Sequence, residues 1–159
     1  MKSAKSEKTE LAGEPTKQPD ISRIRTRILV VDDHPDMRQA LIELINQEET
    51  VAFCLEAGST EQAWNIVDKQ QIDLVIVHVL PGRPEEIQLI EKIKLQCPTI
   101  PILMLSARNE APGAGRTGRR EGGGCIENQV ARDKIIKAVH YVQSLVGTQV
   151  YGFTILVKV

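Results

Sequence analysis

The sequence predicts an α/β domain in which a parallel, doubly wound sheet of five strands carries helices on both faces. Short apolar runs rich in β-branched residues recur along the chain, and most are followed by segments with apolar residues at helical spacing. The connections between these segments are only a few residues long, which favours parallel strands joined by crossover helices. Hydrophobic residues make up 42% and charged residues 26%, ordinary values for a globular domain.

The predicted domain follows a polar leader. Residues 1–25 are mixed in charge and show no periodicity, so we expect them to be disordered and expect the domain itself over 26–147. In chain order the strands are expected at RILVVD, VAFCLEA, DLVIVHV, IPILMLSA and, as a short fifth strand, GGCIEN.

Three helices are predicted between these strands and one after them. Pro35 opens the first helix, and Ser59 with Gln62 has the spacing of a capping box at the start of the second. The residues expected to face the core are Met37, Leu41, Leu44 and Ile45 in the first helix, Ile87, Ile90 and Ile93 in the third, and Ile135, Val139, Val142 and Val146 in the last.

Two segments depart from this pattern. The segment NEAPGAGRTGRREGGG has no apolar stripe and is rich in glycine, so we expect no stable fourth helix there. Its GAGRTG matches GxGxxG, but it neither follows a strand directly nor opens a helix, which argues against dinucleotide binding. Residues 148–159 form an apolar tail that is expected to add an edge strand, to mediate association or to be a sticky end, with no output domain.

Composition excludes several classes of function. The net charge of −1 argues against direct binding of nucleic acid, and no apolar run approaches the roughly 18 residues that a membrane span needs. No signal peptide is evident at the N-terminus. The three cysteines, Cys54, Cys97 and Cys125, form no CxxC pair, which indicates a reducing compartment, most simply the cytoplasm.

Polar residues gather where the predicted strands end. Asp32 and Asp33 follow the first strand, and in a doubly wound sheet ligands bind at the carboxyl ends of the strands. Adjacent carboxylates repel each other, and a hard cation such as Mg²⁺ removes that cost. The alternative is that Asp33 only caps the next helix.

The segments RILVVDDHPDMRQAL, CLEAGSTEQAW, DLVIVHVLPG, PILMLSA and DKIIKAV resemble the receiver domain of bacterial response regulators. The resemblance is greatest to the subfamily whose receiver precedes a helix-turn-helix output domain, and it runs from about Arg27 to Val146. It implies a flavodoxin-like fold with five parallel strands.

The resemblance also implies roles for individual residues. Asp32 and Asp33 match the acidic pair that holds Mg²⁺ in the family. Ser106 and Ala107 match the hydroxyl residue that contacts the phosphoryl group and its small neighbour.

Three positions depart from the family pattern. His78 falls where the family carries the phosphate-accepting aspartate, Asn128 where it carries a lysine, and Cys125 where it carries a switch aromatic. The Pro-Gly turn at Pro81 lies one residue early, so a shifted register would place Val77 at the acceptor position.

We therefore expect that the usual acyl-phosphate cannot form and that Mg²⁺ binding is weakened. Two alternatives stay open: His78 as a substitute nucleophile, and a softer metal held by Asp32, Asp33 and His78. The favoured hypothesis is a hydrogen bond or ion pair between His78 and Asp33.

The sequence thus predicts a stand-alone, degenerate receiver that is not an enzyme and acts by protein docking in two-component signalling. The expected partner is a sensor kinase or another response regulator, docked on the first and last helices, with a homodimer as a further option. The rival interpretations are an active phosphorelay receiver that uses atypical residues and a truncated, decaying transcriptional regulator.

Overall fold

The computed structural model describes residues 25–106, 129–145 and 153–159. These residues form one parallel sheet with strand order β2-β1-β3-β4-β5. The strands are β1 (Thr26–Val31), β2 (Val51–Ala57), β3 (Leu74–Val79), β4 (Ile102–Ser106) and β5 (Thr154–Lys158). The predicted flavodoxin-like α/β fold is confirmed, and its first four strands lie where the sequence predicts them.

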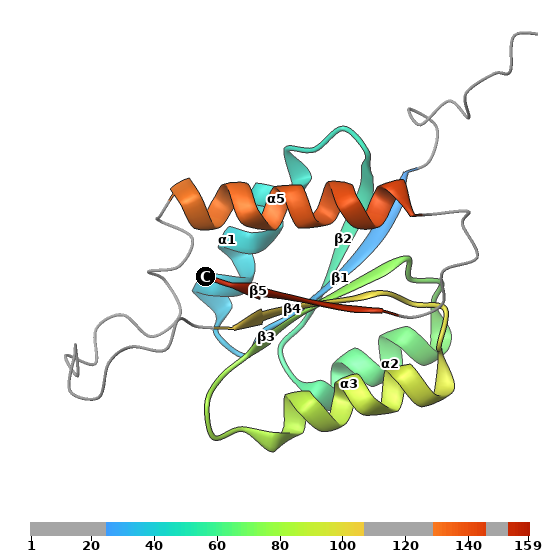
Figure 1. Cartoon of the computed structure of the whole chain (residues 1–159). Coiled ribbons are helices and arrows are strands. Elements are labelled where there is room, and N and C mark those ends of the chain that lie inside the picture. The colour runs from blue at the N-terminus through green and yellow to red at the C-terminus, as the bar shows by residue number, and fades with distance from the viewer. Residues whose placement is uncertain (1–24, 107–128, 146–152) are drawn as a thin grey trace, which may run out of the picture.

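Helices cover both faces of the sheet. Figure 1 shows α1 (Pro35–Asn46) and α5 (Gln129–Ser144) on one face, and α2 (Thr60–Lys69) and α3 (Pro84–Gln96) on the other. None of these helices, within the described ranges, has both the length and the apolar character needed to cross a bilayer.

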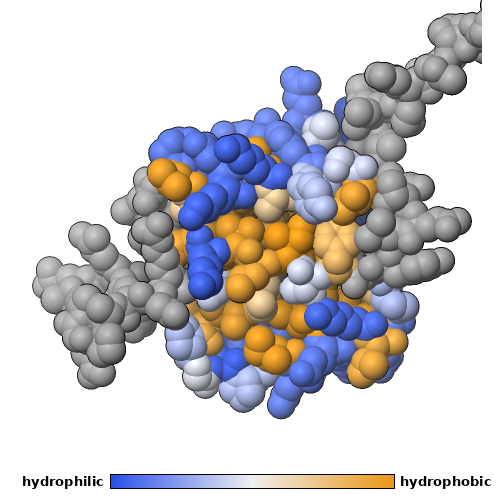
Figure 2. Space-filling model, in the orientation of Figure 1, coloured by the Kyte–Doolittle hydropathy of each residue, from blue (hydrophilic) through white to orange (hydrophobic). Residues whose placement is uncertain are grey.

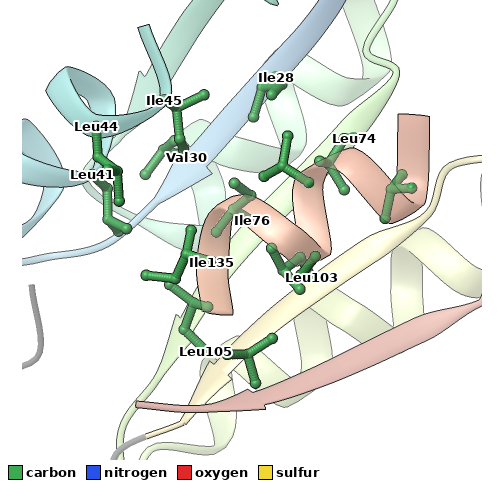
Figure 3. Close-up of a cluster of buried hydrophobic side chains, with 14 of the residues drawn as sticks. Ile28, Val30, Leu41, Leu44, Ile45, Leu74, Ile76, Leu103, Leu105 and Ile135 are labelled. Carbon is green, nitrogen blue, oxygen red and sulfur yellow. The ribbon is translucent and has the colours of Figure 1, made fainter. Parts of the chain in front are cut away.

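The side chains of the central strands alternate between two cores. Ile28 and Val30 of β1 pack with α1 and α5, and Figure 3 shows this cluster, which also takes in side chains of β3 and β4. Leu29 and Val31 point the other way and pack against α2 and α3. This period of two decides which face each residue at the end of a strand will occupy.

The helical stripes largely follow the prediction. All four residues predicted for the core stripe of α1 are buried, and the Ser59 side chain caps α2 by accepting a hydrogen bond from the Gln62 backbone N–H at 3.1 Å. One expectation for α3 is wrong, because Ile87 is 40% exposed. The buried stripe there is Glu86, Leu89, Ile90 and Ile93, and Ile87 lies about 100° around the helix from Glu86.

The fifth strand comes from the end of the chain. The expected strand GGCIEN and the glycine-rich segment before it lie outside the described residues. Instead, β5 pairs in parallel with β4 after α5 has crossed the sheet, so that residues 154–158 of the predicted tail form an edge strand. Its sequence, TILVK, is apolar and β-branched, which suits a strand far better than a glycine triplet does.

Candidate functional site

Asp32 occupies the carboxyl end of β1 and is buried, with 3% of its surface exposed. Its backbone N–H continues the ladder to β2 by donating to the Ala57 carbonyl at 3.1 Å. Both carboxylate oxygens are engaged within the chain: Oδ1 accepts from the His34 backbone N–H at 2.9 Å, and Oδ2 lies 2.8 Å from Nδ1 of His78. Burial of a carboxylate requires such partners.

His78 faces Asp32 because of the strand register. Val31 of β1 is the register partner of Val77 in β3, so the next residues, Asp32 and His78, meet on the α1 and α5 face of the sheet. An ionised carboxylate only accepts hydrogen bonds, so Nδ1–H of His78 donates to Asp32. The expectation that His78 pairs with Asp33 is therefore wrong: Asp33 is one residue further along, and its carboxylate contacts other groups. Val77 lies fully buried in the opposite core, so it does not reach this edge.

Asp33 forms an ion pair with Arg83 across the gap between the β1–α1 and β3–α3 loops. The turn after β3 places Arg83 there. Gly82 has φ +79°, a backbone conformation that favours glycine, and the Arg83 N–H donates to the Leu80 carbonyl at 3.4 Å. The predicted Pro-Gly turn thus brings a guanidinium to the acidic pair.

His34 completes the cluster and is the residue that sequence reasoning left without a role. Its Nδ1 lies 2.9 Å from Asp33 Oδ1 and 3.6 Å from Asp32 Oδ1. His34 is the N-cap residue of α1, so the alternative in which Asp33 caps this helix is wrong. The only signal available in the sequence was the adjacency of His34 to the two aspartates.

Arg38 braces the same loop from the second turn of α1. Its Nη1 donates to the backbone carbonyl of Asp32 at 2.8 Å, and its Nε donates to Oε2 of Glu56 on β2 at 3.0 Å. These contacts fix the backbone of Asp32 as well as its carboxylate. The acidic pair is consequently held from β2, β3 and the two loops beside it.

Ser106 ends β4 and is half-buried, and its register partners are Val79 on β3 and Lys158 on β5. Its carbonyl accepts from the Val159 N–H at 2.9 Å. Asn128, Ala107 and Cys125 lie outside the described residues. The strand that the structure places beside β4 ends in Lys158, a cation at the carboxyl edge that the sequence analysis did not consider.

The family resemblance raises the question of Mg²⁺. As arranged, the residues do not fit it, because each oxygen of Asp32 already accepts an N–H and Asp33 is paired with Arg83. Mg²⁺ prefers free carboxylate oxygens and water in octahedral geometry. The ligand atoms of Asp32, Asp33 and His34 do lie within 4.8 Å of one another, close enough to hold a metal ion if those contacts were given up. The softer-metal site expected from the sequence contained His78, but the histidine that belongs to this group of possible ligands is His34.

A doubly wound parallel sheet with an acidic pair after its first strand defines the flavodoxin-like class of α/β proteins with a site at the carboxyl edge. Within that class, residues 28–140 match the model of the response regulator receiver domain. The match covers more than half of the chain, and the chain therefore belongs to this family.

Known relatives agree with this family. The chain is 32% identical over 82 residues to response regulator GtcR of Aneurinibacillus migulanus, a match that covers 52% of this chain and 33% of that protein. It is 27% identical to the Fimbriae Z protein of Salmonella typhimurium, covering 74% and 56% of the two chains. The chain thus spans about half or less of the length of these relatives.

Solved structures support the fold. The isolated REC domain of RcsB from Salmonella enterica serovar Typhimurium superimposes with a TM-score of 0.58 at 21% identity, covering 82% of this chain and 94% of that one. The Francisella response regulator 1452 receiver domain gives a TM-score of 0.54 at 17% identity, covering 77% and 99%. At these identities the likeness concerns the fold alone.

Proposed function

We propose that this chain is a receiver module of two-component signalling that is not phosphorylated and acts by docking to proteins. The observation that supports this proposal most directly is the buried pair of His78 and Asp32, 2.8 Å apart. His78 stands at the position where the resemblance implies a phosphate-accepting aspartate. Asp32, one of the two aspartates that the resemblance assigns to Mg²⁺, forms a hydrogen bond with the His78 ring instead.

The pair also argues against His78 as a substitute nucleophile. Its Nδ1 is held by Asp32, and only 3% of its side chain is exposed. Phosphoryl transfer needs the nucleophile in line with the donor and cations around the transferred group. The His78 ring is held by Asp32 and is buried, so a phosphodonor cannot approach it in line.

The acidic pair has internal substitutes for a bound cation. Arg83 forms an ion pair with Asp33 and His78 forms a hydrogen bond with Asp32, so the guanidinium offsets the mutual repulsion of the carboxylates without Mg²⁺. We therefore expect weak Mg²⁺ binding and a site that stays in one state. Such a module would be constitutive, because neither metal nor phosphoryl group shifts a population.

The remaining parts of the proposal are consistent with membership of the receiver family. The chain is not an enzyme, it is cytoplasmic, and its partner is a protein, namely a sensor kinase or another response regulator. The relatives that are methylesterases share only a part of their length with it, since the match covers 22% of the Pyrococcus abyssi protein. Of the helices expected to dock, α5 presents exposed apolar side chains, Val130 and Tyr141.

One observation favours the alternative of an active receiver. Lys158 lies at the carboxyl end of β5 beside Ser106, so the described part of the site has a lysine at this edge after all. The case for an inert site accordingly depends on His78 and the paired aspartates, and not on a missing lysine.

Intact mass spectrometry tests the two functions. The chain is incubated with acetyl phosphate and Mg²⁺, and a parallel sample carries His78→Asp, which restores a carboxylate. We expect an unchanged mass for the natural chain. The gain of one phosphoryl group on the natural chain, at any aspartate or histidine of the site, would refute the proposal and support the active receiver.

A further inference from the structure

The outer edge of β5 presents backbone groups that pair with no other strand among the residues the structure describes. The Val159 N–H donates to the Ser106 carbonyl and the Ile102 N–H donates to the Phe153 carbonyl, so the odd-numbered residues of this strand turn their backbone groups toward β4. In a parallel ladder the alternate residues turn theirs away. The N–H and C=O groups of Thr154, Leu156 and Lys158 therefore point outward, where β5 is the last strand of the sheet.

The side chains of the same residues lie on the less covered face. Val157 is buried beneath α5 and Ile155 packs against that core, so Thr154, Leu156 and Lys158 project on the opposite face. Leu156 is 50% exposed. Figure 2 shows hydrophobic residues gathered over this part of the molecule, between α5 and α3. An apolar edge strand with open backbone groups is a template for another strand.

We infer that this edge binds the same edge of a second copy of the chain, with the two β5 strands antiparallel about a two-fold axis at Leu156. The strand has five residues and its central one faces outward. Leu156 then pairs with its own counterpart, and Thr154 pairs with Lys158 of the other copy on each side. These pairs are all of the hydrogen-bonded kind, in which both residues exchange N–H···O bonds, so every outward group of the strand is satisfied.

The side chains match under the same symmetry. On one face, Leu156 meets Leu156 and each Lys158 meets Thr154; on the other, Ile155 meets Val157. Apolar groups oppose apolar groups, and no lysine opposes a lysine. The two Lys158 residues are about 13 Å apart along the strand direction, beyond the Debye length in physiological salt. A symmetric pair closes on itself and does not propagate into a fibre.

A second copy fits this edge better than an unrelated strand does. The outward residues Thr154, Leu156 and Lys158 are centred on Leu156, so two copies related by a two-fold axis there match both their backbone groups and their side chains. Within the described part of the chain, the pairing displaces the contact of Lys134 Nζ with the Lys158 carbonyl, which is long at 3.4 Å and exposed. The inference rests on the proposed function in one respect: it names the docking surface of a module that needs no phosphorylation.

Light scattering coupled to size exclusion tests the pairing on the full chain over micromolar to millimolar concentrations. We expect a concentration-dependent dimer. Leu156→Lys places two lysines directly opposite each other and should raise the dimer Kd at least about tenfold, since like charges directly opposite destabilise strand pairs. Leu156→Glu, measured by itself, should raise the dimer Kd in the same way, because it places two glutamates opposite each other.

An equimolar mixture of the Leu156→Lys and Leu156→Glu variants should dimerise again. Position 156 pairs with itself across the axis, so a lysine faces a glutamate only when one copy of each variant combines. Leu95→Lys is the matched control: this leucine is 83% exposed on α3 and is not part of β5, and its replacement should leave the dimer intact. Circular dichroism checks that all variants are folded.

A monomer at every concentration, an open-ended polymer, or a dimer unaffected by either Leu156 variant would overturn the inference, as would a mixture that stays monomeric. The mass of the same samples after acetyl phosphate reports separately on the proposed function. A phosphorylated dimer would count against that function alone, whereas an unmodified monomer would count against the inference alone.

Discussion

The carboxyl end of β1 and the outer edge of β5 belong to one sheet but satisfy their polar groups in different ways. Around Asp32 the carboxylate oxygens and the backbone carbonyl all accept hydrogen bonds from within the chain, and His78 beside it is 4% exposed. Along β5 the outward N–H and C=O groups pair with no further strand among the described residues, Lys134 Nζ lies 3.4 Å from the Lys158 carbonyl, and the central Leu156 is half exposed.

The difference follows from burial. A charged group inside a protein is stable only when it is paired, so a site whose nucleophile position and metal ligand pair with each other is stable as it stands. An edge strand is stable in water without a partner and keeps its capacity to bind one. Under the two proposals made above, the region expected to switch is fixed, and the region that binds a partner lies elsewhere on the sheet.

The largest expected effect comes from breaking the buried pair. His78→Ala leaves the buried Asp32 with one oxygen unpaired. An unsatisfied buried acceptor that carries charge costs about 3 kcal/mol or more of the free energy of unfolding. Urea denaturation monitored by circular dichroism measures this loss.

The chain offers a matched control in a second histidine–carboxylate pair. His140 Nε2 lies 2.7 Å from Glu48 Oε2, but both groups are accessible to solvent. His140→Ala should cost less than about 1 kcal/mol, the usual range for exposed pairs. Equal losses for the two variants would contradict the view that the burial of Asp32 and His78 sets their importance.

Two leucines on neighbouring strands extend the comparison to apolar packing. Leu105 of β4 is fully buried beneath α5, whereas Leu156 of β5 is half exposed. Leu105→Ala should lower the free energy of unfolding by about 2–5 kcal/mol. Leu156→Ala should lower it by less than about 1 kcal/mol when measured at a concentration that keeps the chain monomeric. A large loss for the Leu156 variant under those conditions would show that this residue belongs to the core of the monomer.

Much of the fold is predictable from local patterns, for a physical reason. The inner strands β1, β3 and β4 are runs of largely buried apolar residues, and the α1 stripe of Met37, Leu41, Leu44 and Ile45 repeats at the period of a helix. The place of the fifth strand is set by its pairing with β4, a long-range contact that no local pattern encodes. The sequence predicts the fifth strand at GGCIEN, whereas the structure places TILVK beside β4.

The site was predictable in its members but not in its pairing. Asp32, Asp33 and His78 are visible as polar residues at strand ends, and the structure brings them to one edge. Which aspartate meets His78 depends on the register of Val31 with Val77, a long-range property that no local pattern encodes. The role of Arg83 depends similarly on the conformation of Gly82 in the turn before it.

A smaller effect is expected from freeing Asp33. Arg83→Ala removes the guanidinium that competes with a cation for this carboxylate, so Mg²⁺ affinity should rise by about tenfold, equivalent to about 1.4 kcal/mol. Isothermal titration calorimetry measures it. Arg27→Ala is the control, because Arg27 pairs with Asp73 at the opposite end of the sheet, with Nε 3.2 Å from Oδ2, and it should not change Mg²⁺ binding. An unchanged affinity in the Arg83 variant would mean that Asp32 and His78 alone prevent binding.

The smallest effect concerns a thiol on β2, the edge strand on the far side of β1 from β5. Burial raises the pKa of Cys54 from 9.0 to about 11. The folded state therefore holds the thiol proton more tightly than the unfolded state does, so this contribution to stability is complete below pH 9 and is lost as the pH rises toward 11. Because the thiol is only partly buried, the loss should be a fraction of the full pKa difference.

Urea midpoints measured between pH 8 and 11 test this contribution, with Cys54→Ala as the reference that lacks the thiol. As the pH rises, the free energy of unfolding of the natural chain should fall relative to that of the Cys54→Ala variant. A difference that stays constant across this range would show that Cys54 titrates alike in the folded and unfolded states. The same burial should slow alkylation at neutral pH by up to about a hundredfold relative to a thiol of ordinary pKa, since the thiolate is the reactive form.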